Sequence, residues 1–277
     1  MSAPVRTIRL IVAYDGAGFA GWQRQDGLRT VQVDLEQVMS AIEGTPVHVA
    51  GAGRTDAGVH AAAQVASVRL TASITPHRLL RACNATLQPD VRVLAADEVF
   101  DRFHARLHAR GKTYRYYIWN APAGQPLLRR LAWHVPQPLS LPAMQDAARA
   151  FVGEHDFSAF QAQGSDVQTT VRCMWTSTVD VDAALPGWCA LPGSRGRLLC
   201  FEVSGEGFLR HMVRVMAGTL VWAGKGRFGP VHVSRALAGA GRDAAGPTAP
   251  PYGLHLWQVH YDDDTPGPAA PDPSNVQ

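Results

Sequence analysis

The residues best suited to chemistry lie in a glycine-rich segment, Gly51-Ala52-Gly53-Arg54-Thr55-Asp56-Ala57-Gly58-Val59-His60. Its glycines allow the backbone to turn tightly and to approach a ligand closely. Apolar runs precede and follow the segment, so we expect Arg54 and Asp56 on a loop between two strands, where reactive groups are usually displayed. From the spacing alone, an ordinary Gly-Asp surface turn is an equally good interpretation.

Asp56 is a single carboxylate with arginines and a tyrosine as candidate partners. A carboxylate beside an arginine is held in its ionised form, so Asp56 would be available as a nucleophile. Arg54 could orient Asp56 or hold a phosphate. Chemistry at glycosidic bonds commonly uses two carboxylates, and no second acidic residue has an equally specific context. A uracil leaving group needs less protonation because its anion is delocalised, so one carboxylate could suffice.

Other common site motifs are missing from the sequence. Gly111-Lys112-Thr113 resembles the end of a P-loop, but that motif needs glycine where Arg106 stands. There is no Gly-x-Ser-x-Gly elbow. The four cysteines form no C-x-x-C pair, and the 11 histidines form no metal-binding pattern. The sequence therefore suggests no zinc ribbon, redox motif or other metal site.

The charge distribution favours a polyanionic partner. Four acidic residues fall in the last 16 positions, which contain no Lys or Arg, so the rest of the chain is more basic than its net charge of +3. Lys112 and Lys225 are the only lysines. Arginine suits bidentate recognition of phosphate. The most basic and aromatic stretch is 102–117, where Arg102, Arg106 and Arg110 are candidate phosphate contacts.

The chain is long enough for two domains with their own cores. We predict an α+β protein of two similar halves, each a mixed or antiparallel sheet flanked by helices, with a catalytic cleft between them. The predicted domains are residues 1–105 and 106–261, followed by a disordered acidic tail at 262–277. The patterns predict these elements: strands at 5–14, 91–94, 113–119, 171–182, 197–204 and 254–259, and helices at 30–42, 75–84, 141–152 and 208–222.

Several motifs resemble, in order, those of the tRNA pseudouridine synthase A family. The similarity extends over nearly the whole chain apart from the acidic tail. The matching stretches are Tyr14-Asp15-Gly16, Gly21-Trp22-Gln23-Arg24-Gln25, Thr30-Val31-Gln32, Gly53-Arg54-Thr55-Asp56-Ala57-Gly58-Val59-His60, Lys112-Thr113-Tyr114-Arg115-Tyr116, His155-Asp156-Phe157, Phe208-Leu209-Arg210-His211-Met212-Val213-Arg214 and Gly253-Leu254.

The resemblance implies a pseudouridine synthase fold and a role for each matching residue. Asp56 would be the nucleophile, and Arg214 would pair with it. Tyr114 would stack on the target base, and Leu254 would pack beside that base. Without the resemblance, Tyr114 reads as half-buried strand packing, Arg214 as a solvated helix residue and Leu254 as core.

The implied activity is isomerisation of uridine to pseudouridine at positions 38, 39 and 40 of the tRNA anticodon stem-loop. The implied enzyme is a homodimer that contacts tRNA with both subunits and uses no cofactor. Two other functions stay open: a non-catalytic tRNA-binding or chaperone protein on the same fold, and a nucleoside hydrolase or base glycosylase that releases free uracil. The chain shows neither a signal-peptide core nor a membrane-spanning apolar run, so we expect a cytoplasmic protein.

Overall fold

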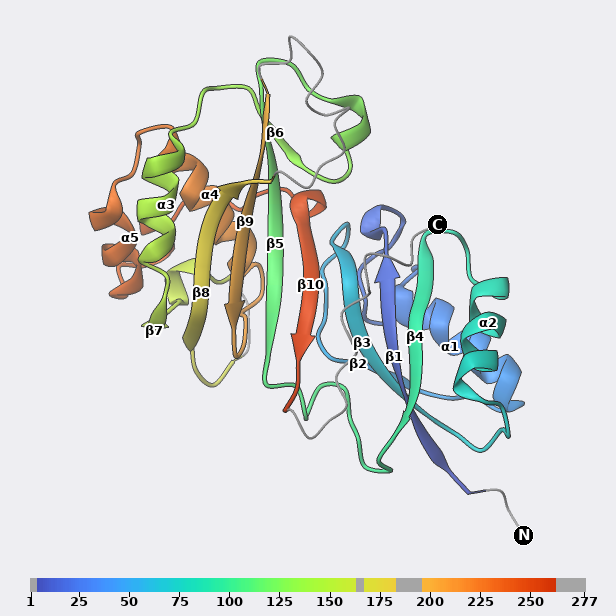
Figure 1. Ribbon diagram of the computed structural model, residues 1–277. Helices are drawn as coiled ribbons and strands as arrows, with labels where there is room; N and C mark the ends of the chain where they lie inside the picture. Colours follow the sequence, from blue (N-terminus) through green and yellow to red (C-terminus); the bar gives the residue numbers. More distant parts are fainter. Residues whose placement is uncertain (1–3, 163–166, 183–195, 263–277) are drawn as a thin grey trace. The chain divides into compact units, whose positions relative to one another are not determined.

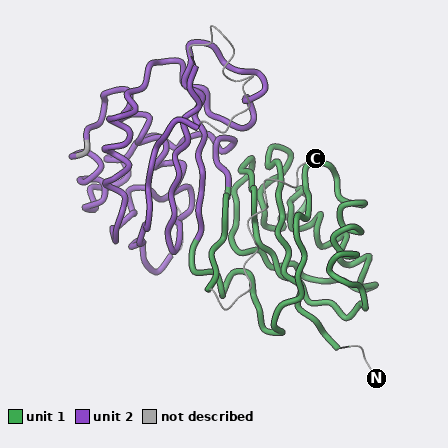
Figure 2. Tube along the Cα trace, in the orientation of Figure 1, with its two compact units in different colours: residues 1–111, 256–277 green, residues 112–255 purple. Residues whose placement is uncertain are grey.

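A computed structural model describes residues 4–162, 167–182 and 196–262. The chain forms two compact units (Figure 2). Unit 1 contains residues 1–111 and 256–277, and unit 2 contains residues 112–255. The domain boundary predicted between residues 105 and 106 stays a prediction. The compact units divide six residues later and group the C-terminal residues with unit 1.

Unit 1 is an antiparallel sheet covered by two helices. Strand β1 (Arg6–Tyr14) pairs with β3 (His60–Leu70) on one edge and with β4 (Val91–Val99) on the other. The short strand β2 (Val49–Gly51) pairs with β3. Helices α1 (Val31–Glu43) and α2 (Pro76–Thr86) lie on one side of this sheet (Figure 1). Alternate β1 side chains and the inner helix faces are fully buried: Ile8, Leu10, Val12, Leu35, Met39, Leu79 and Cys83.

The ends of α1 and α2 follow from local sequence. The Thr30 hydroxyl accepts a hydrogen bond from the amide of Val33, and Gly44 ends α1 in the left-handed conformation at φ 81°. The Thr75 hydroxyl caps α2, which begins at Pro76. Both predicted helices are confirmed.

Unit 2 contains a mixed sheet. The antiparallel order is β5 (Gly111–Asn120), β9 (Arg197–Gly205), β8 (Val171–Val181) and β7 (Gly153–Asp156). The short β6 (Trp133–Val135) pairs with β5 in parallel. Helices α3 (Leu141–Arg149), α4 (Met212–Gly224) and α5 (Pro230–Leu237) lie together beside this sheet (Figure 1). Strand β10 (Leu254–His260) runs from unit 2 into unit 1.

The predicted α+β class, with sheets flanked by helices, is confirmed. One helix start is wrong: the structure begins α4 at Met212 instead of Phe208, because His211 adopts a left-handed conformation at φ 64° that interrupts the helix. Helix α5 was not predicted. Residues 183–195 and all but the first residue of the predicted tail at 262–277 lie outside the described residues. Within the described residues, no helix is both long and apolar enough to cross a membrane.

Helix α4 is the most buried helix of unit 2. Its Gly218 lies against the backbone of Pro247, so that a Cβ at this position would come 1.8 Å from the carbonyl oxygen. The next residue, Thr219, accepts a hydrogen bond from the amide of Gly246 at 2.8 Å. The segment 246–249 is therefore held directly on the backbone of α4.

We expect Gly218→Ala to lower the free energy of unfolding of unit 2 by about 3 kcal/mol, because the added methyl group must displace backbone. Chemical denaturation of the full chain measures this change. Gly207→Ala is the control, since its Cβ would meet only the Arg172 side chain at 3.4 Å. Equal stability of the two variants would contradict the close contact.

Candidate active site

Asp56 lies on the loop between β2 and β3, as the sequence predicts. Its side chain is half-buried, whereas Arg54 on the same loop is exposed and Thr55 is buried. The loop is anchored at its base, where the amide of Ala52 donates to the carbonyl of Val65 at 2.8 Å. It is anchored again where Gln64 Nε2 donates to the Gly53 carbonyl at 2.9 Å. The first part of the loop, before Arg54, is therefore held on β3.

A second loop, residues 15–25, packs against the loop that carries Asp56. The amide of Trp22 donates to the carbonyl of Thr55 at 3.1 Å, and the amide of Gly16 donates to His60 Nδ1 at 3.1 Å. Asp15 caps the short 3₁₀ helix η1 (Gly16–Gly18) by accepting a hydrogen bond from the Ala17 amide.

Glycines make this contact possible. Gly21 has φ +100°, and a Cβ on it would lie 2.5 Å from the carbonyl oxygen of Thr55. A Cβ on Gly16 would lie 2.0 Å from the carbonyl oxygen of Val59, and one on Gly51 would lie 2.4 Å from the Trp22 ring. This supporting role of the glycines was not predicted. The glycines that flank Phe19 and Trp22 are the feature of the sequence that indicates it.

A buried hydrogen bond fixes the residue before Asp56. The hydroxyls of Tyr14 and Thr55 are 2.8 Å apart in the interior of unit 1. Burial raises the pKa of Tyr14 to about 12, although its hydrogen bonds with Thr55 and Gln64 lower it in part. The phenol therefore stays neutral at physiological pH and can donate to Thr55.

Arg54 contacts the 15–25 loop. Its Nε donates to Gln23 Oε1 at 3.2 Å, and the rest of its guanidinium is exposed. Both predicted roles of Arg54, orienting Asp56 or holding a phosphate, stay open. Its guanidinium can bond to Gln23 and still donate to a phosphate.

In unit 2, Arg214 lies in the first turn of α4 and is tied to the segment before β10. Its Nε donates to the carbonyl of Ala249 at 2.8 Å, and its own carbonyl accepts from the Ala249 amide at 3.0 Å. These paired bonds set the direction of the side chain, which is half-buried. The solvated-helix interpretation is therefore incomplete, because the guanidinium is anchored.

Tyr116 connects the same segment to β5. Its hydroxyl donates to the Pro250 carbonyl at 2.8 Å, and its ring fills the space that a Cβ on Gly253 would need, at 2.6 Å. Burial raises the pKa of Tyr116, and the charge of Arg214 partly opposes this shift. Leu254 follows directly and is 7% exposed. Arg214 and Leu254 are thus held through one segment, residues 249–254.

Tyr114 is on the same β5 face as Tyr116, two residues earlier. It is 8% exposed, and its ring meets Phe208 edge to face with centroids 4.9 Å apart. Its cross-strand neighbour on β9 is Val203. The contact between Phe208 and Tyr114 was not predicted, although both residues lie in the matching motifs.

The predicted site residues fall into two sets. Asp56 and Arg54 belong to unit 1, whereas Tyr114, Arg214 and Leu254 belong to unit 2. Their grouping into one site stays a prediction. Among the described residues, no three His, Cys, Asp or Glu side chains are grouped to hold a metal ion.

Comparison with known proteins identifies close relatives. A family model described as tRNA pseudouridine synthase matches residues 10–106 and 147–262. The chain is 43% identical over 257 residues to the tRNA pseudouridine synthase A of Pelobacter propionicus, covering 93% of this chain and 100% of that protein. It is 41% identical to that of Geobacillus kaustophilus, covering 93% and 95%. A solved H/ACA RNP bound to a substrate RNA containing 2′-deoxyuridine matches at a TM-score of only 0.31 and 15% identity, over 90% of this chain and 50% of that chain.

The pKa of Tyr14 predicts how stability responds to alkaline pH. Because folding raises this pKa from 10.0 to about 12, its stabilising contribution is complete below pH 10 and is lost as pH rises toward 12. We expect the native protein to lose about 1.4 kcal/mol more unfolding free energy than Tyr14→Phe between about pH 8 and about pH 11.

Urea denaturation at several pH values measures this difference. Thr55→Val is the matched control, since it removes the hydrogen-bond partner and keeps the titrating phenol. An identical pH response of Tyr14→Phe and the unmodified protein would contradict the assignment.

Proposed function

Because this chain belongs to the tRNA pseudouridine synthase family, we propose that it converts uridine to pseudouridine at positions 38, 39 and 40 of the tRNA anticodon stem-loop, with Asp56 as the nucleophile. The main structural support is the presentation of Asp56. Its carboxylate is half-buried on a loop whose backbone is fixed from both sides.

The reaction is an isomerisation, so its atoms balance within the nucleoside. The bond between uracil N1 and C1′ breaks, the base turns, and C5 bonds to C1′. C5 then loses a proton and N1 gains one. The Asp56 carboxylate can form a transient bond to C1′ or promote a glycal intermediate, and a single ionised acid suits either route.

The residues of unit 2 supply binding and orientation in this proposal. A uridine inside a stem must leave the helix to react, and an aromatic ring can replace its lost stacking. The Tyr114 ring suits this stacking role because Phe208 packs against it edge to face. Arg214, anchored at Ala249, would orient the Asp56 carboxylate, and Leu254 would pack against the base.

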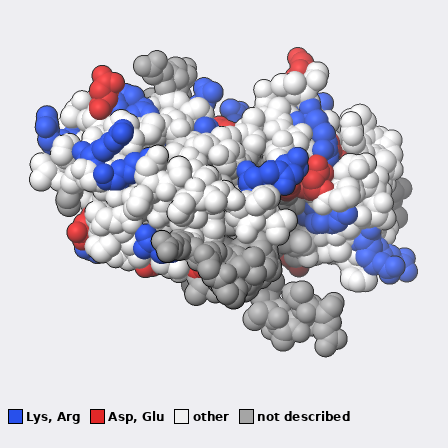
Figure 3. All heavy atoms as spheres, turned by 90° about the horizontal axis from the view of Figure 1, so that it is seen from above, with Lys and Arg blue, Asp and Glu red and all other residues white. Residues whose placement is uncertain are grey.

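Basic residues support tRNA as the partner. Figure 3 shows Lys and Arg side chains spread over one face of the molecule, with fewer Asp and Glu side chains among them. In unit 1, Arg102 and Arg106 are exposed. Arg110 is exposed too, although its guanidinium pairs with Asp262 at 2.6 Å. Such arginines suit contacts with phosphates that carry no sequence information.

The proposal includes a homodimer that works in the cytoplasm, as the family resemblance implies. The alternative is a non-catalytic tRNA-binding or chaperone protein on this fold. The two differ in what happens at C5 of the target uridine, because only the enzyme releases its hydrogen.

We expect Asp56→Asn to lower the rate of pseudouridine formation at least about 1,000-fold, since the amide cannot act as a carboxylate nucleophile. The measurements are tritium release from tRNA labelled at uridine C5 and carbodiimide mapping of positions 38 to 40. The control is Asp26→Asn, which changes an exposed acid directly after the supporting loop and is expected to keep its activity. Turnover by Asp56→Asn at the native rate would overturn the proposed chemistry.

The position of Asp56 depends on Gly21. We expect Gly21→Ala to lower kcat about 100-fold, because the added Cβ would push the Thr55 carbonyl and move the neighbouring carboxylate. Gly27→Ala is the matched control: it also has a positive φ, +72°, but its Cβ meets nothing within 4 Å. Similar kcat values for the two variants would show that backbone strain, rather than displacement of the loop, causes any loss.

A further inference from the structure

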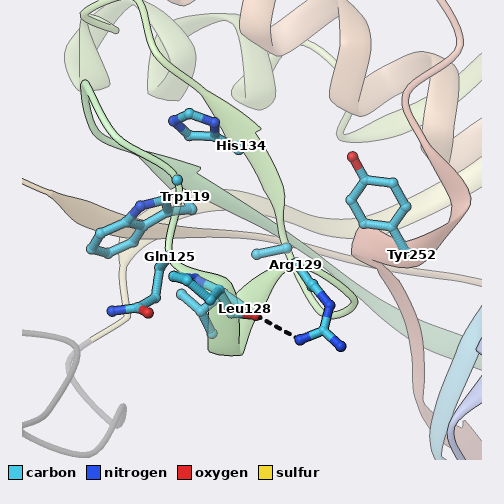
Figure 4. Close-up of a pocket in the computed structure, with 9 residues that line it drawn as sticks. Trp119, Gln125, Leu128, Arg129, His134 and Tyr252 are labelled. Atoms are coloured by element: carbon cyan, nitrogen blue, oxygen red, sulfur yellow. Dashed lines mark hydrogen bonds between the residues drawn. The ribbon is translucent and has the colours of Figure 1, made fainter.

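Unit 2 contains a pocket of about 450 Å³ that includes none of the site residues discussed above (Figure 4). It lies beside the end of β5 and the 3₁₀ helix η2 (Pro126–Leu128). Tyr252, in the 3₁₀ helix η6 (Pro251–Gly253), also lines it. This volume is within the range of small-ligand sites in proteins. Among the described residues, those that line it include no acid.

The floor of the pocket is apolar. Trp119, Leu128 and Ala132 line it, and together with Ala121 and Leu198 they form a small buried cluster. The indole Nε1 of Trp119 donates to the Ala123 carbonyl at 3.0 Å, which fixes the ring. The floor is therefore pre-formed, and a flat apolar group can settle on it without reorganising the protein.

The rim is polar and accessible. Figure 4 shows Trp119 and Gln125 toward one side of the pocket and Arg129 and Tyr252 toward the other. Arg129 is exposed and uses Nη1 to donate to the Pro126 carbonyl at 3.1 Å, which leaves Nε and Nη2 for other acceptors. The adjacent Arg130 is exposed as well. The rim thus carries positive charge next to an apolar floor.

His134 gives the pocket a directional acceptor. Its Nε2 lies 2.8 Å from the Ala121 carbonyl oxygen, so the ring hydrogen is placed on Nε2. In the neutral ring Nδ1 is then an acceptor. His134 lines the pocket, and the neighbouring Gly124 carries no side chain: a Cβ there would lie 3.4 Å from Nδ1. An N–H group of a ligand can therefore bond to Nδ1.

We propose that this pocket binds one unpaired nucleotide of the tRNA substrate, distinct from the uridine that is isomerised. The base lies over the apolar floor beside Tyr252, one of its N–H groups donates to His134 Nδ1, and a flanking phosphate contacts Arg129. Nucleobases combine a flat apolar face with edge donors, and the phosphate supplies the matching charge. Because the substrate is tRNA, this inference rests on the proposed function.

The test compares two pocket variants with two controls by measuring the Kd of an unmodified tRNA transcript. Gly124→Leu fills the space over His134, and Gly124→Ala adds only a methyl group in ordinary contact. Arg129→Gln removes the phosphate contact, and Arg149→Gln removes an exposed arginine of α3. We expect about a tenfold higher Kd for Gly124→Leu and Arg129→Gln and at most a twofold change for the controls.

Salt dependence separates the two contacts. Arg129→Gln lowers the slope of log Kd against log salt concentration by about 1, whereas Gly124→Leu leaves the slope unchanged. The kcat at saturating tRNA stays within about twofold of the native value for both variants. Thermal melting of all four variants is the check that each of them is folded.

The proposal is overturned if both pocket variants bind tRNA as tightly as the native protein, or if kcat falls while Kd stays constant. It is also overturned if free uridine 5′-monophosphate occupies the pocket while Gly124→Leu leaves tRNA binding unchanged. Failure of the proposed function has a different signature, because the native protein would then bind tRNA without forming pseudouridine.

Discussion

The candidate site depends on direct backbone contact between two loops of unit 1. The 15–25 loop lies so close to the Asp56 loop that Gly21 has no room for a side chain beside the Thr55 carbonyl. The Trp22 amide bonds to that same carbonyl, and the buried Tyr14 hydroxyl bonds to the Thr55 side chain. Thr55 is thus held by backbone and side chain, which restricts the residue after it. In the proposed role of Asp56 as nucleophile, a carboxylate restricted in this way loses little freedom when it meets the substrate.

Unit 2 fixes its candidate residues by the same physical means. Three contacts hold the backbone of segment 246–254. Gly218 of α4 packs against Pro247, Arg214 donates to the Ala249 carbonyl, and the Tyr116 ring packs against Gly253. The carbonyl acceptor of Ala249 helps to direct the guanidinium of Arg214. Both units therefore support polar groups on elements with little freedom to rearrange.

Much of this could be predicted from sequence, because the signals were local. Capping residues and apolar periodicity gave α1 and α2, and glycine-rich spacing placed Asp56 on a loop between strands. The α4 start was wrong because a left-handed His211 has no sequence signature. The contacts of Gly21 with Thr55 and of Tyr116 with Gly253 link residues far apart in the chain, so no local pattern reveals them. The pocket around His134 was missed for the same reason.

The chemistry attributed to Asp56 does not by itself select a substrate. A carboxylate can act on any uridine that reaches it. Selection must therefore come from groups that bind the rest of the tRNA. Exposed arginines bind phosphates without regard to sequence, so they provide affinity and little discrimination. The pocket in unit 2 differs, because a fixed acceptor at His134 and an apolar floor distinguish a presented base from a paired one. The two proposals together thus place discrimination in unit 2 and bond breaking on the loop of unit 1.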